Sequence, residues 1–164
     1  MPQDAAALLA QLIALGVPAD LDVDVRCGPI NVRFGGYFDP AEDGQLAVLV
    51  PIFPDAPSDD DMVAFFADNP SRWWRNSTAP ILNPDAIDRA IHFQEPLAVW
   101  SSPLSWLRAG GDGVVILTDD LDVGFHLRGV PTVNAETVEL AQTIDRRLRV
   151  VVSLPRIRVP RRAA

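Results

Sequence analysis

The chain has 164 residues, of which 48% are hydrophobic, and this is enough for one well-buried core or for two small lobes that share one. No apolar run approaches the roughly 18 to 20 residues of a membrane span, and the start Met1-Pro2-Gln3-Asp4 lacks the positive segment of a secretory signal, so we expect a cytoplasmic protein without a membrane partner. Because Cys27 is the single cysteine, the chain can form neither an intrachain disulfide nor a thiolate metal cage.

The charge is acidic overall and unevenly distributed. The formal net charge is −8, which favours basic partners over phosphate backbones. Acids dominate before residue 70, where they face only Arg26 and Arg33, whereas no acid follows Asp145. Every cation of the chain is an arginine, and guanidinium groups suit contacts with phosphate and carboxylate.

The first half of the chain predicts one helix and several short strands. Residues 4–15 carry apolar side chains at helical spacing, and the following Gly16 and Pro18 end the helix. Alternation of apolar and acidic residues predicts a half-buried strand over 21–25, and a turn is expected at 27–29. Further strands are predicted over 30–34, 46–53 and 62–67, with an acidic loop over 54–61. Residues 1–80 are therefore expected to form a small α+β lobe with an antiparallel sheet.

The second half, residues 81–154, alternates strands with helices. Asn83-Pro84 predicts a capped helix to about Ile91, and Ser102-Pro103 repeats this signal for a helix to about Ala109. Strands are predicted over 97–100, 114–117 and 150–154, and Asn134 is expected to cap a helix over 135–148. This βαβ order predicts an α/β fold with a mostly parallel sheet, followed by a basic tail over 155–164.

The order of these elements resembles the catalytic core of bacterial and phage-type replicative primases. The resemblance covers roughly residues 8–150 and rests on the segments GGYFDP, LAVLVPIF, MVAFFAD, SRWWRN and LAVWSSPLSWLRAGGDGVVIL. It implies a small N-terminal lobe, a Toprim-like second lobe and a place in DNA replication. Where the family has a catalytic Glu, then a Gly and an Asp, this chain has Ser101, Ser102 and Ser105. The resemblance thus implies a degenerate member without catalytic residues of its own, or a fragment that acts with a partner.

The segment Arg72-Trp73-Trp74-Arg75 is the first candidate site. Aromatic side chains interleaved with arginines can stack on unpaired bases and neutralise phosphates. We expect this segment to bind single-stranded nucleic acid or replication proteins together with the arginines of the tail, Arg156, Arg158, Arg161 and Arg162. Two alternatives remain: one tryptophan is core and the other lies in a groove, or the segment is a protein interface.

Three acids form the second candidate site. Asp119, Asp120 and Asp122 follow a predicted parallel strand, where α/β sheets place their ligands, and carboxylates there can hold Mg²⁺. The alternative is a solvated acidic turn.

The sequence thus supports three hypotheses. The first is a non-catalytic nucleic-acid-binding or replication-complex module that needs no cofactor. The second is an acidic adaptor or inhibitor that binds a basic protein partner and mimics the charge of DNA. The third is a small Mg²⁺-dependent phosphotransfer enzyme that uses the acids of the second candidate site.

Overall fold

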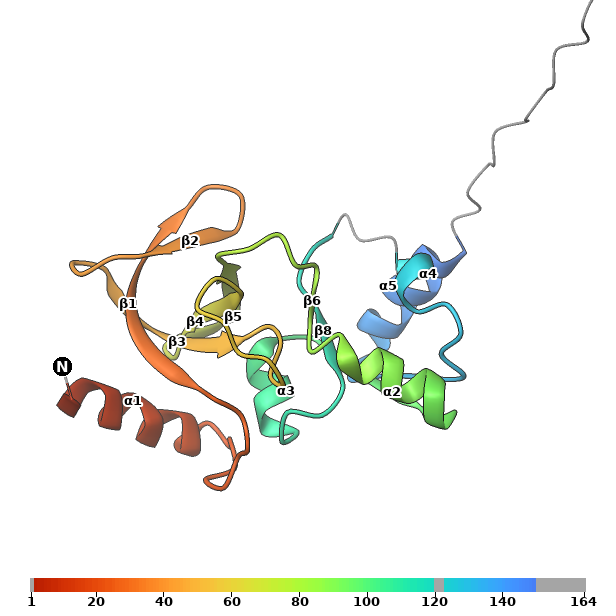
Figure 1. The fold of residues 1–164 in the computed structure, drawn as a ribbon, viewed down its shortest axis with the longest axis horizontal. Helices are drawn as coiled ribbons and strands as arrows, with labels where there is room; N and C mark the ends of the chain where they lie inside the picture. Colours follow the sequence, from red (N-terminus) through yellow and green to blue (C-terminus); the bar gives the residue numbers. More distant parts are fainter. Residues whose placement is uncertain (1, 120–122, 150–164) are drawn as a thin grey trace, which may run out of the picture.

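The computed structural model describes residues 2–119 and 123–149, and the chain has an α/β fold (Figure 1). A five-stranded barrel lies at one end of the molecule, and the second sheet with α2, α4 and α5 lies at the other. The elements are, in chain order, α1 (Pro2–Ala14), β1 (Arg26–Arg33), β2 (Tyr37–Pro40), β3 (Gln45–Pro51), β4 (Met62–Phe66), β5 (Asn69–Arg75), β6 (Ile81–Leu82), α2 (Asp85–Phe93), β7 (Leu97–Trp100), α3 (Pro103–Arg108), β8 (Val114–Ile116), α4 (Val123–His126), β9 (Val133–Ala135) and α5 (Val138–Leu148).

The first five strands close into a barrel in the order β1-β2-β5-β4-β3. Four neighbouring pairs are antiparallel, but β2 and β5 pair in parallel through Tyr37 and Arg75, so the prediction of an antiparallel sheet is wrong at this one seam. Closure removes the free edges that an open sheet would expose. A cluster drawn from all five strands packs between them: Ile30, Phe38, Ala47, Met62, Ala64 and Trp74.

Strand β1 begins later than the sequence predicts. The strand expected over 21–25 is absent from the described residues, because Leu21, Val23 and Val25 pack against the core without joining a ladder. The turn expected at 27–29 is also wrong, since these residues lie inside β1 and pair with β3. Gly28 suits this place because a Cβ there would approach Leu49 Cδ1 to 3.0 Å.

The second sheet has the order β6-β8-β7-β9. β7 pairs in parallel with both β8 and β9, and β6 pairs antiparallel with β8, so the predicted mostly parallel sheet is confirmed. β6, β9 and α4 are two to four residues long and were not predicted, because such short elements carry no periodic pattern.

One apolar cluster joins the barrel to the second sheet. Trp106 of α3 is fully buried in it, between side chains of α1, the barrel strands β3 and β4, and β8. Figure 1 shows α3 between the barrel and β8. The barrel and the second sheet therefore share one core. Its members include Leu8, Leu12, Val48, Val50, Val63, Phe65, Leu104, Leu107 and Val115.

Ser102 caps α3 as predicted, since its Oγ accepts a hydrogen bond of 3.1 Å from the Ser105 backbone N–H. Asn134 does not cap α5. It lies in β9, and Thr137 caps the helix instead by accepting from the Leu140 N–H.

Asn83 is not a helix cap either. Pro84 occupies the N-cap of α2, and Asn83 is buried with a left-handed backbone of φ 58°. Its Nδ2 donates to the carbonyl oxygens of Gly111 at 3.3 Å and Gly113 at 2.9 Å. Asparagine tolerates this left-handed conformation, and its side chain here links the start of α2 to the loop before β8.

Several predictions lie outside the described residues: the strand over 150–154, the basic tail over 155–164, and Asp120 and Asp122. Within the described ranges, no helix has both the length and the apolar character that crossing a membrane requires.

Candidate nucleic-acid interface

The aromatic-basic segment forms β5, and its side chains alternate between the two faces of the barrel wall. Trp74 is 7% exposed and packs inside the barrel cluster, with its ring 5.1 Å from that of Phe66. Trp73 lies on the outer face, where it is partly buried against the core that joins the barrel to the second sheet. Of the two tryptophans, therefore, only Trp73 offers a surface to a ligand, while Trp74 is a core residue.

The β1–β2 turn places a second aromatic ring beside Trp73. Gly35 and Gly36 both have positive φ values, 84° and 82°, which glycine adopts without strain. The turn leaves the side chain of Phe34 entirely exposed, at 103%. A hollow of about 480 Å³ separates the turn from β5 and is lined by Val32, Arg33, Phe34, Gly35, Gly36, Ser71, Arg72, Trp73 and Trp74. We call this surface the β5 face.

Two arginines of β5 lie against other rings of the barrel. The guanidinium of Arg72 lies 5.5 Å from the centre of the Trp74 ring, and that of Arg75 lies 5.2 Å from the centre of the Tyr37 ring. Arg75 also donates to the carbonyl of Ala79 at 3.0 Å, and Arg33 forms an ion pair with Asp39. The described lining of the hollow contains two arginines and no acid, although Asp39, which is not part of the lining, pairs with Arg33.

A second cleft lies where the parallel strands end. Ser101 follows β7, the segment Leu117–Asp119 follows β8, and Glu136 follows β9. The carboxyl edge of such a sheet is where α/β proteins place ligands. The cleft measures about 230 Å³, and its lining includes Trp73, Ser101, Asp119, Thr143 and Arg147. Trp73 thus lines both this cleft, which we call the edge cleft, and the hollow of the β5 face.

The side chain of Glu136, which follows β9, lies at the end of the neighbouring strand β7. Its Oε2 accepts hydrogen bonds from the Ser101 backbone N–H at 2.8 Å and from the Ser101 Oγ at 2.5 Å. Partial burial alone would raise the pKa of Glu136, but these bonds, together with Ser105 and the charge of Arg108, lower it below its ordinary value. A carboxylate therefore lies beside Ser101 at the end of β7. Sequence reasoning missed Glu136 because it is 35 residues away from Ser101.

The two charged residues that line the edge cleft, Asp119 and Arg147, form an ion pair. Arg147 of α5 donates to Asp119 at 3.0 Å, and the arginine side chain is 25% exposed whereas that of Asp119 is fully exposed. Among the described residues, no three acids, histidines or cysteines are grouped as metal ligands, and Asp120 and Asp122 of the predicted Mg²⁺ site lie beyond that part of the chain. The tail arginines of the predicted interface, Arg156, Arg158, Arg161 and Arg162, also lie outside it.

Comparison with models of protein families found no match, and neither did comparison with curated proteins or with solved structures. The primase resemblance accordingly stays a prediction.

Proposed function

We propose that this protein is a module that binds single-stranded nucleic acid along a path from the β5 face to the edge cleft. The observation that carries the proposal is the position of Trp73, which lines both the hollow of the β5 face and the edge cleft. Phe34 lies at one end of this path and Arg147 at the other. A role within a replication complex stays a prediction from the sequence.

The chemistry of this path suits unpaired bases and their phosphates. The exposed ring of Phe34 and the part of the Trp73 side chain that the core leaves uncovered offer stacking surfaces, and stacking of a base on an aromatic side chain contributes about 1–3 kcal/mol. Arg72 lies along the same path and can approach a phosphate, and Arg33 and Arg147 can do so by exchanging their ion pairs with Asp39 and Asp119. A duplex would hide its bases from these rings, so we expect single strands to be preferred.

The net charge of −8 sets the conditions for binding. It opposes non-specific attraction to nucleic acid, so binding depends on the local path and weakens with salt. One to three phosphate contacts on a single strand give a slope of about −1 to −2 for log K against log salt concentration. This slope is much shallower than that of strongly basic proteins, which contact many phosphates.

Fluorescence anisotropy of a labelled short oligo(dT) tests the proposal. We expect Trp73→Ala to weaken binding by about 5- to 150-fold, which corresponds to the loss of one stacked base. Phe93→Ala and Arg89→Ala are matched controls, because both side chains are exposed and belong to the other end of the second sheet. Flat anisotropy at low salt, or equal affinity of the wild type and Trp73→Ala, would contradict the proposal.

A further inference from the structure

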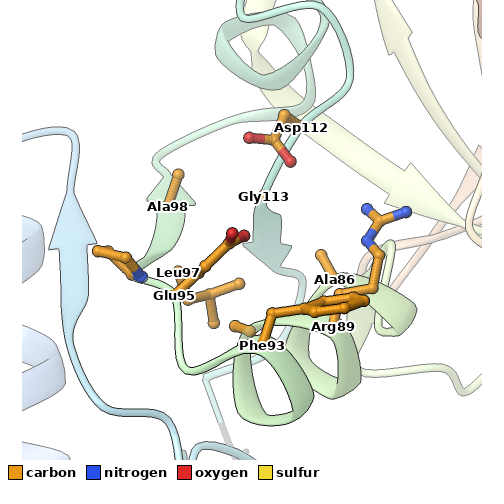
Figure 2. Close-up of a pocket in the computed structure, with 10 residues that line it drawn as sticks. Ala86, Arg89, Phe93, Glu95, Leu97, Ala98, Asp112 and Gly113 are labelled. Carbon is orange, nitrogen blue, oxygen red and sulfur yellow. The ribbon is translucent and has the colours of Figure 1, made fainter.

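A separate pocket lies at the opposite edge of the second sheet, where β7 and β8 begin (Figure 2). It measures about 320 Å³ and lies between α2 and the first residues of the two strands. Figure 2 shows the carboxylates of Glu95 and Asp112, the guanidinium of Arg89 and the ring of Phe93 around one hollow. Its apolar lining comes from Ala86, Ala90, Pro96, Leu97 and Ala98.

Asp112 lies on a loop whose backbone carbonyls accept hydrogen bonds from three side chains. The Trp100 Nε1 donates to the carbonyl of Asp112 itself at 2.7 Å. The next carbonyl, that of Gly113, accepts from Asn83 Nδ2 at 2.9 Å and from Trp106 Nε1 at 3.0 Å. These bonds leave the loop little freedom, so the Asp112 carboxylate keeps its place at the rim of the pocket.

The end of α2 supplies the other wall. Gln94 ends the helix in a left-handed conformation of φ 56°, and the chain then turns into β7 past Glu95. Phe93 is 63% exposed at this corner. Within the described part of the chain, the carboxylates of Glu95 and Asp112 take part in no ion pair, and the nearest carboxylate to Arg89 is that of Asp55 at 4.0 Å.

We propose that this pocket binds the side chain of an arginine presented by a basic segment of a partner protein. A guanidinium has a flat face that stacks on a ring such as Phe93 and a fork of donors that suits the carboxylates of Glu95 and Asp112. Its apolar stem packs against the alanines of α2. We expect Arg89 to donate to a backbone carbonyl of the bound partner segment. The net charge of −8 attracts such a basic partner. The pocket shares no lining residue with the β5 face or the edge cleft, so this inference does not depend on the proposed nucleic-acid binding.

Amide chemical shifts of the full chain, titrated with a short peptide that contains one arginine, test the inference. The reference probe is the same peptide with citrulline, which keeps the shape of arginine but has no charge. We expect shifts at residues 93–95, 97–98 and 112–113, with the citrulline peptide bound about tenfold or more weakly, because hydrogen bonds to charged groups contribute more than neutral ones. Equal binding of the two peptides, no shifts, or shifts spread over the acidic segments would overturn the inference.

Two double variants separate the pocket from general charge. Glu95→Gln with Asp112→Asn removes both carboxylates of the pocket, whereas Glu42→Gln with Asp43→Asn removes two exposed acids before β3. All four side chains are on the surface, so both variants should fold, and their spectra without peptide show whether they do. The inference expects the first variant to lose about tenfold in affinity and the second to bind like the wild type. Equal loss in both variants would also overturn it.

Discussion

Replacing Asn83 should loosen the loop that joins α3 to β8. Asn83 is 3% exposed and fastens this loop through hydrogen bonds to the carbonyls of Gly111 and Gly113. Its backbone has a φ of 58°, a conformation that most side chains disfavour. Asn83→Ala loses both bonds and keeps the unfavourable backbone, whereas Asn83→Gly loses the same bonds and relieves the backbone.

The expected losses follow from these contacts. Each hydrogen bond contributes about 1 kcal/mol, so both variants lose about 2 kcal/mol of unfolding free energy. Alanine in the left-handed region costs about 1–2 kcal/mol more. The greater flexibility of glycine in the unfolded chain offsets about 0.4–1 kcal/mol of this difference. We therefore expect a loss of about 2 kcal/mol for Asn83→Gly and about 3 kcal/mol for Asn83→Ala.

Urea unfolding followed by tryptophan fluorescence measures these losses, because Trp100 and Trp106 donate to the same loop. The slope of free energy against urea should be the same in all three proteins, which shows that the same surface unfolds. If Asn83→Ala is as stable as the wild type, or more stable than Asn83→Gly, the account of this residue is wrong.

Three further predictions concern stability. The pKa of Glu136 is lowered in the folded chain, so its contribution to stability is present above the unfolded pKa and is lost as pH falls through the folded pKa. In thermal melts below about pH 4, the Glu136→Gln variant should therefore lose less stability than the wild type does. Equal losses would argue against the hydrogen bonds from Ser101. Gly113→Ala brings a Cβ to 2.5 Å from the Ala98 carbonyl oxygen at a φ of 78°, so circular dichroism should show a lower melting temperature, and an unchanged one would refute the close approach. Trp106→Phe leaves a cavity and removes a hydrogen-bond donor to the Gly113 carbonyl, so it should lower the free energy of unfolding in urea by about 1–3 kcal/mol. An unchanged free energy of unfolding would contradict the burial of this ring.

Local signals explain which elements could be predicted. Ser102 and Pro103 mark the start of α3 within two residues, because capping and proline geometry are local effects. The continuous apolar run of β4 reflects burial on both faces, and all but its last residue are buried. Such elements need no knowledge of the distant chain.

Closure of the barrel and assembly of the site depend on distant residues. The parallel seam joins Tyr37 to Arg75, and nothing near either residue indicates that the two strands meet. The sequence singled out Trp73 and Trp74 but did not tell which one faces outward, since alternation alone leaves the face open until the register of β4 and β5 is known. Glu136 was missed for the same reason, because its partner Ser101 follows another strand.

Ultraviolet cross-linking of the protein to oligo(dT), followed by mass spectrometry of the linked peptides, tests the central claim most directly. We predict cross-links at Phe34 and Trp73, because Phe34 is fully exposed and Trp73 is the partly exposed ring that lines both hollows of the path. The links at Trp73 should disappear in Trp73→Ala, and the control Phe93→Ala should keep all of them. Binding without cross-links to the β5 face, or cross-links centred on α2, would contradict the proposed path.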